Sequence, residues 1–150
     1  MAELNPEYLA ALYRAVNGSP FPLHMGMRLV LVEPDRSRVQ LDIARHHLQP
    51  FGIVHGGAVA TLIDTATFWT GFSGIPEDSG LVNVDLKLNY LATARAGRLI
   101  AEGRTIRTGK TLLYAEATVK GEDGSLVAHG TSTLMALPGK GLSLGVPKFL

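Results

Sequence analysis

Cysteine is absent from this chain of 150 residues. Its absence excludes disulfides, thiolate metal sites and cysteine nucleophiles, and it agrees with a reducing compartment, so we expect a cytoplasmic protein. An excess of charge of one sign is also missing, because the formal net charge is +1 and the lysines and arginines are scattered. A nucleic-acid-binding surface needs clustered basic residues, so no nucleic-acid partner is expected.

Long apolar runs and targeting segments are missing as well. The first residues lack the basic and apolar pattern of a secretory signal. The longest apolar stretch, 56–72, contains Asp64 and several threonines, which argues against a membrane span. The length fits a single domain, 1–150, and a content of 46% hydrophobic and 18% charged residues is typical of a packed globular protein.

Two segments have the spacing of helices. The first, about 5–17, opens on the capping residue Asn5 and Pro6, and a turn-rich stretch, 19–22, follows it. The second runs from Gly56 to about Phe72 and has one apolar stripe and a smaller opposite face. The stripe consists of Val59, Leu62, Ile63, Ala66 and Trp69. The smaller face consists of Ala60, Thr61, Asp64, Thr67 and Phe68.

Six segments are predicted to be strands, mainly from alternating apolar and polar residues and from the turns between them. They are 27–33, 37–43, 82–90, 98–107, 110–120 and 125–137. Short connections favour antiparallel pairing, and the apolar helix needs a sheet to cover it. The sequence therefore predicts an α+β fold of the hotdog type, a curled antiparallel sheet of about six strands around one long central helix. The tail, 137–150, has no clear period.

The segment leading into the long helix is the strongest candidate for chemistry. Gly56 and Gly57 would expose backbone N–H groups at the start of the helix, where an oxygen that gains negative charge in acyl transfer could bind. Asp64 follows two turns later on the less apolar face. Burial would raise the pKa of this carboxyl group, which suits a general base. Alternatively, Asp64 only accepts hydrogen bonds from Thr61 or Thr67.

The histidines of this region are weaker candidates. His55 could act as a base, but a histidine beside a glycine turn more often anchors its loop by a hydrogen bond, and we favour that role. His46 and His47 are adjacent, so their side chains would point to opposite sides, and no third ligand has a sensible spacing. No metal site is predicted.

A second glycine-containing segment, 103–111, is similar to a phosphate-binding loop. It has five residues between its glycines where that loop has four, and it joins two strands, so a nucleoside-triphosphatase is excluded. The segment is either a solvated hairpin turn, or Arg107 and Lys110 meet the phosphates of a nucleotide-bearing substrate. No Gly-x-Ser-x-Gly motif occurs. The aromatic residues Phe68, Trp69 and Phe72 fit core or interface packing better than an acyl-binding site.

The motif Gln49-x-x-Gly52-x-x-His55-Gly56-Gly57, followed by Leu62-x-Asp64, resembles the hotdog-fold acyl-CoA thioesterases of the phenylacetate-degradation (PaaI) type. The segments 82–91 and 108–111 resemble the later strands of that family. The resemblance covers about residues 20–136.

The resemblance implies an acyl-CoA thioesterase in which Asp64 acts on water as a general base, or attacks as a nucleophile to form a mixed anhydride. The N–H of Gly56, with or without that of Gly57, would polarise the thioester carbonyl. Gln49 stands where the family often has asparagine and would orient water or the thioester, and Asn83 would lie near the water. The implied substrate-binding residues are His55, Gly57, Arg107, Gly109, Lys110 and Thr111.

The resemblance also implies a homodimer with shared active sites, and dimers that pair into tetramers. Asp64 and Asn83 would come from one chain, and Gln49 and Gly56 from the other. Neither a metal nor a cofactor is expected, since the CoA moiety belongs to the substrate.

Three other functions stay open at this point. A hotdog enoyl-thioester hydratase or dehydratase would pair a loop histidine with a helical carboxylate and would lack the Gly-Gly placement. A non-catalytic acyl-CoA-binding module would use Asp64 structurally. A transcription regulator on this fold would need a DNA-binding unit, for which roughly 20 residues before the first strand are too few.

Overall fold

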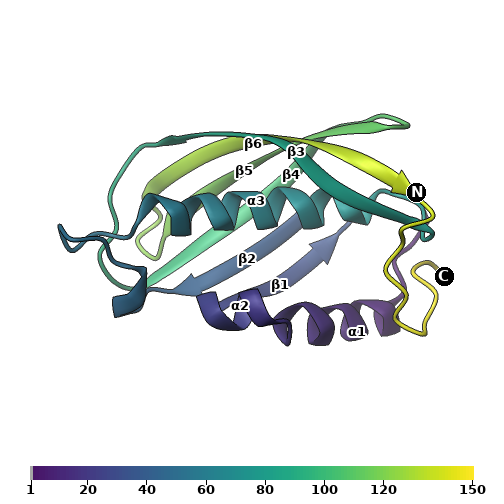
Figure 1. Cartoon of the computed structure of the whole chain (residues 1–150), viewed down its shortest axis with the longest axis horizontal. Helices are drawn as coiled ribbons and strands as arrows, with labels where there is room; N and C mark the ends of the chain where they lie inside the picture. The colour runs from purple at the N-terminus through teal and green to yellow at the C-terminus, as the bar shows by residue number, and fades with distance from the viewer. Residues whose placement is uncertain (1) are drawn as a thin grey trace.

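The computed structural model describes residues 2–150 as one six-stranded sheet that curls around a long helix (Figure 1). The helices are α1 (Pro6–Asn17), α2 (Pro20–Met25) and α3 (Gly56–Ser73), with a 3-10 turn at Arg45–His47. The strands are β1 (Met27–Glu33), β2 (Arg36–Asp42), β3 (Ser79–Tyr90), β4 (Arg98–Thr108), β5 (Leu112–Gly121) and β6 (Leu126–Pro138). All pairings are antiparallel, in the order β1-β2-β4-β5-β6-β3. The predicted α+β hotdog fold is confirmed.

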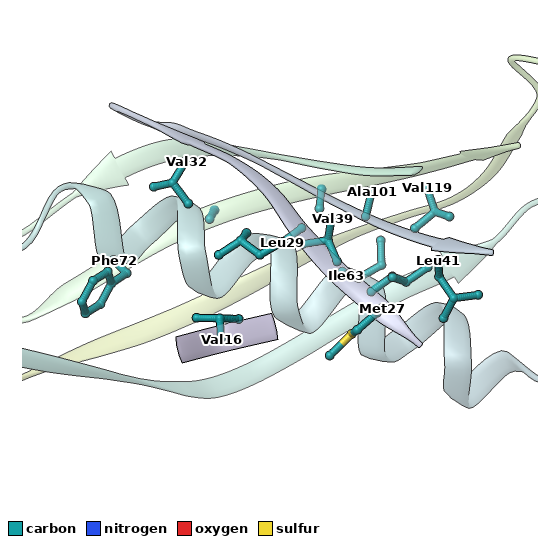
Figure 2. Packing of buried hydrophobic residues seen from close by; sticks show 14 of the residues in the cluster. Val16, Met27, Leu29, Val32, Val39, Leu41, Ile63, Phe72, Ala101 and Val119 are labelled. Carbon is teal, nitrogen blue, oxygen red and sulfur yellow. The ribbon is translucent and has the colours of Figure 1, made fainter. Parts of the chain in front are cut away.

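Helix α3 lies directly on the sheet because the sheet carries glycines beneath it. A Cβ atom at Gly103 of β4 would lie 2.6 Å from the carbonyl oxygen of Ala66, and one at Gly130 of β6 would lie 2.8 Å from Ile63. No larger residue fits at either position without moving the helix. The core is built around this contact, and Figure 2 shows Leu29 of β1 and Val39 of β2 in the core beside Ile63 of α3.

The predicted stripe of α3 is confirmed for Val59, Leu62, Ile63 and Ala66, which are buried, while Trp69 is only half-buried. Thr67 was placed on the smaller, less apolar face, and that placement is wrong. Thr67 is fully buried, and its hydroxyl lies 2.8 Å from Ser132 Oγ and donates to the carbonyl of Ile63. A threonine can occupy the core because these bonds satisfy its hydroxyl.

The turn-rich interpretation of residues 19–22 is also wrong, because helix α2 begins at Pro20. Proline is tolerated in the first turn of a helix, where its missing N–H has no intrahelical partner. Gly26, with a φ of 67°, ends α2 in the left-handed conformation. Helix α1 is capped by Asn5 as expected, and α1 and α2 pack against β1, an edge strand of the sheet (Figure 1).

The C-terminal tail fixes the end of α3 through one buried cation. Lys148 is 1% exposed, and its Nζ donates to the carbonyl oxygens of Phe72 at 2.6 Å and Ile75 at 2.7 Å. The tail also pairs with the residues before α1 through Leu4 and Phe149, so both chain ends lie together (Figure 1). Burial lowers the pKa of Lys148 to about 8, against a smaller opposing effect of Glu77.

Replacing Lys148 with methionine should lower the free energy of unfolding by about 2 kcal/mol at pH 7, because two buried carbonyls lose their donor. It should also remove a pH dependence. The folded pKa lies below the ordinary 10.5, so the unfolded chain binds more protons between about pH 8 and 10.5, and this residue makes stability rise with pH there. Urea unfolding measured at pH 7 and from pH 8 to 10.5 tests both effects.

The matched control is Lys120→Met, since Lys120 is an exposed lysine of β5. It should keep the wild-type stability and its pH dependence. Equal behaviour of the two variants would show that Lys148 does not hold the end of α3.

Candidate active site

Asp64 meets Asn83 between the middle of α3 and strand β3. Asn83 Nδ2 donates to the carboxylate Oδ1 of Asp64 at 2.7 Å and to the Asp64 carbonyl oxygen at 3.3 Å. The carboxyl group is half-buried. Burial raises its pKa above the ordinary value, and the hydrogen bond from Asn83 opposes this rise. A carboxylate with a raised pKa at the edge of solvent is suited to taking a proton from water.

The backbone of β3 bulges where Asn83 meets the helix. The register with β6 shifts between Asn83 and Asp85, so Val84 is the extra residue. Bulges re-aim side chains and are common beside active sites. Asn83 Oδ1 is buried and has no hydrogen-bond partner among residues 2–150, so this amide keeps one acceptor beside the carboxylate.

The alternative in which Asp64 binds only neighbouring threonines does not describe this structure. Thr61 Oγ1 donates to the carbonyl of Gly57, and Thr67 Oγ1 donates to the backbone carbonyls of Ile63 and Asp64. In the described chain, the carboxylate oxygens accept a hydrogen bond from Asn83 alone.

The start of α3 offers one free backbone donor. His55 caps the helix, because its Nδ1 accepts the N–H of Gly57 at 2.7 Å. This is the anchoring bond that the sequence favoured for His55, and it occupies the donor of Gly57. The N–H of Gly56 has no acceptor within residues 2–150. Of the two glycines, Gly56 is therefore the one that can polarise a substrate oxygen.

Tyr90, at the end of β3, contacts Gly56 at the start of α3. Its hydroxyl donates to the carbonyl of Gly56 at 3.0 Å, and a Cβ at Gly56 would come within 3.0 Å of its ring. Gln49 lines the same pocket of about 240 Å³, and its Oε1 accepts the N–H of Phe51. Sequence reasoning missed Tyr90 as a site residue, because its alternation with polar neighbours showed only that it belongs to the apolar side of β3.

A single chain does not bring the Asp64 carboxylate and the Gly56 N–H together. Gly56 and Asp64 are eight residues apart on α3, which corresponds to about 12 Å along the helix axis. The pocket around Gln49 and Gly56 does not include Asp64, which lines a different hollow. Asp64 with Asn83 and Gly56 with Tyr90 are therefore two separate groups, which we call the two candidate half-sites.

The turn with the candidate phosphate-binding residues lies further away, at the other end of α3. Thr108 lies beside Gly74, just after the helix, whereas Gly56 starts it, about 25 Å away along the axis. Arg107, Lys110 and Thr111 are exposed there, and the Gly109 N–H donates to the carbonyl of Leu112 at 2.8 Å. The predicted strand beginning at Lys110 begins instead at Leu112, because residues 109–111 form the turn.

The hollow beside Asp64 has a volume of about 350 Å³. Its walls come from α1, α2, β1, β2, α3 and the tail, and they are mainly apolar. Phe68 and Trp69 line it, whereas Phe72, the third aromatic residue of α3, is buried in the core.

Among residues 2–150, no three histidine, aspartate or glutamate side chains lie close enough together to hold a metal ion. His47 is buried with its Nε2 2.6 Å from the carbonyl oxygen of Met25. In the same range, no helix combines the length and apolar character needed to cross a membrane.

Two relatives of this chain have names that describe the hydrolysis of CoA thioesters. The chain is 28% identical over 110 residues to 1,4-dihydroxy-2-naphthoyl-CoA hydrolase of Listeria monocytogenes, covering 73% of this chain and 89% of the relative. It is also 28% identical over 110 residues to acyl-coenzyme A thioesterase 13 of Mus musculus, covering 70% and 76%. The crystal structure of a thioesterase from Haemophilus influenzae has the same fold, with a TM-score of 0.83, 22% identity and coverage of 92% and 96%.

Residues 51–128, more than half of the chain, match the Thioesterase superfamily. The matched segment includes both half-sites, Gly56 with Tyr90 and Asp64 with Asn83. This match confirms the sequence-based prediction of a thioesterase: the chain belongs to the Thioesterase superfamily.

Proposed function

We propose that the protein hydrolyses an acyl-CoA thioester to the free acid and CoA, in the manner of the PaaI-type enzymes it resembles. The observation that carries this proposal is the Asp64 carboxylate, half-buried against Asn83 and facing an apolar hollow. The names of its relatives, a naphthoyl-CoA hydrolase and an acyl-CoA thioesterase, support a CoA thioester as the substrate.

In the proposed reaction, Asp64 removes a proton from water while the water oxygen attacks the thioester carbonyl carbon. The carbonyl oxygen takes up negative charge and is held by the N–H of Gly56. The tetrahedral intermediate then collapses, the carbon–sulfur bond breaks, and CoA leaves as a thiolate that takes up a proton. A general base fits the raised pKa of Asp64. Direct attack by the carboxylate, through a mixed anhydride that water then cleaves, is the alternative route.

A complete site requires two chains, because the half-sites lie apart in one. Strand β3 is an edge strand that pairs with β6 alone among the strands of residues 2–150. Its exposed residues include Val82 and Val84, the latter 51% exposed. Exposed apolar edges favour pairing with another strand. The proposed functional unit is a dimer in which the two β3 strands pair antiparallel about a two-fold axis.

This pairing would join the two half-sites. Asn83, which contacts Asp64, and Tyr90, which contacts Gly56, lie on either side of Leu86 on the same strand. An axis near Leu86 therefore brings the Gly56 end of one chain to the Asp64 end of the other. With the axis at Leu86, Asp85 also lies opposite the partner's Lys87, a favourable cross-strand pair. The pairing of dimers into tetramers, and the binding of CoA phosphates by Arg107 and Lys110, remain predictions.

Thiol release from a panel of acyl-CoA esters tests the proposed function, and the absence of release from every ester would contradict it. A hydratase of the same fold fits the geometry less well, because Nδ1 of the loop histidine His55 is occupied by the helix cap. Water addition to an enoyl-CoA ester separates that activity from hydrolysis.

Replacing Asn83 with alanine should move the acid limb of the pH–rate profile to higher pH. The hydrogen bond from Asn83 lowers the pKa of Asp64, so its loss leaves burial to raise that pKa further. The reactive carboxylate then forms only at higher pH, and activity falls first on the acid side. The profile of kcat/KM from pH 4 to 8 measures this, with Asp78→Asn, at an exposed residue of the loop after α3, as control. A uniform loss at every pH would contradict the coupling.

A further inference from the structure

The hollow beside Asp64 is a surface pocket of the size that small ligands occupy. Its volume is about 350 Å³. Pockets that bind small ligands begin at about 300 Å³. Larger hollows exist elsewhere on the surface, but this one has the proposed catalytic carboxylate in its wall. The helices α1 and α2 line one side of it.

The wall offers little to a polar guest. Two of its hydroxyl groups are already used, since Ser19 Oγ donates to the carbonyl of Val16 at 2.6 Å and Thr65 Oγ1 donates to that of Thr61 at 2.7 Å. Asp64 is the single ionisable group among the described lining residues. The rest of the wall is mainly aliphatic and aromatic. A hydrocarbon is the guest that such a wall binds best.

We propose that this hollow binds the acyl group of the substrate, and that this group is a hydrocarbon of medium size. The proposal rests on the proposed thioesterase function. A cavity of about 150 Å³ accommodates benzene, so a hollow somewhat more than twice as large takes an acyl group of roughly eight to twelve carbons, linear or bicyclic. The far end of a long-chain acyl group would extend beyond the hollow.

The direction of the acyl group follows from the helix. Trp69 lies five residues after Asp64, about 7.5 Å further along α3. An acyl chain whose carbonyl carbon lies beside Asp64 therefore runs along the hollow toward Trp69. Part of the wall comes from residues outside the matched family segment, Ala15 of α1 and Pro22 of α2.

Binding can be measured without catalysis, because Trp69 is the single tryptophan of the chain. Titration with octanamide, an uncharged medium-chain ligand, should shift the emission of Trp69 to shorter wavelength with saturation, and acetamide should not. Ala15→Phe should weaken octanamide binding by at least about tenfold by filling the hollow. Ala15 is exposed at the rim of the hollow, so Ala10→Phe, the same change at an exposed position of α1 that does not line the hollow, is the matched control and should leave binding unchanged.

The kinetic arm uses acetyl-, octanoyl- and palmitoyl-CoA. Ala15→Phe should lower kcat/KM for octanoyl-CoA by at least about tenfold and leave acetyl-CoA within about twofold, because only the longer group fills the hollow. Trp69→Ala, which enlarges the hollow from α3, should raise the ratio of palmitoyl-CoA to octanoyl-CoA hydrolysis.

The outcomes separate this inference from the proposed function. If the protein hydrolyses the esters but shows no saturable octanamide binding, the proposal that the hollow binds the acyl group is wrong and the proposed thioesterase activity stands. If it binds octanamide but cleaves no ester, the proposed activity is wrong and the hollow stands as a binding site. Equal effects of Ala15→Phe on all three esters, or equal effects of Ala15→Phe and Ala10→Phe on octanamide, also overturn the hollow.

Discussion

Replacing Asp64 with asparagine should lower kcat by at least about 100-fold, because the amide can no longer accept a proton from water or attack the thioester. The fold should survive, since asparagine has nearly the same shape and its side-chain oxygen can still accept the hydrogen bond from Asn83. Thiol release under saturating octanoyl-CoA measures the loss. Thermal unfolding and octanamide binding should both match the wild type.

Asp78→Asn is the matched control, because Asp78 is an exposed carboxylate in the loop after α3. Its activity should equal that of the wild type. An Asp64→Asn enzyme with undiminished kcat would remove the carboxylate from the chemistry and leave the site without its central group.

Mixing two inactive variants should restore activity if the site is shared between chains. Gly56→Val should be inactive, because a side chain there meets the ring of Tyr90 and shields the N–H donor. Together with Asp64→Asn, it forms mixed dimers in which one of the two sites has both Asp64 and Gly56 intact. With random pairing, half of the dimers are mixed, so activity should return to about a quarter of the wild-type value.

The two variants must be unfolded and refolded together, or co-expressed, so that subunits exchange. Separately refolded proteins mixed afterwards serve as the control and should remain inactive. If co-refolding restores nothing while size-exclusion chromatography shows mixed dimers, each site lies within a single chain and the proposed assembly is wrong.

Local pattern was enough to predict most of this fold. The stripe of α3 depends on which residues face the core, and it is visible in the sequence. The alternation of β3 correctly predicted a strand, but most of its apolar residues, including Val84 and Tyr90, are exposed and do not face the core. Helix α2 was missed because Pro20 and Pro22 indicate a turn unless proline's tolerance in a first helical turn is considered. Thr67 was misplaced because a sequence does not show which hydroxyl groups find partners in the core.

The site was predictable only in part. Asp64 and Gly56 stand out because a carboxylate in an apolar helix and a glycine at its start are unusual, and the family resemblance added Asn83. The contact between Tyr90 and Gly56 depends on where β3 lies in the sheet, and residue alternation does not determine strand order. The hollow depends on how α1 and α2 pack against α3, which no local pattern encodes.

The position of β3 also has a consequence for biosynthesis. Tyr90 ends this strand, but β6, which holds it in the sheet, begins only at Leu126. A nascent chain must therefore grow by 36 residues before β3 can be secured, whereas β1 and β2 can form their hairpin at once. Such distant pairings form slowly. The strand that carries Asn83 and Tyr90 should be among the last elements to be fixed, so a newly made molecule acquires most of its sheet before it acquires the proposed catalytic centre.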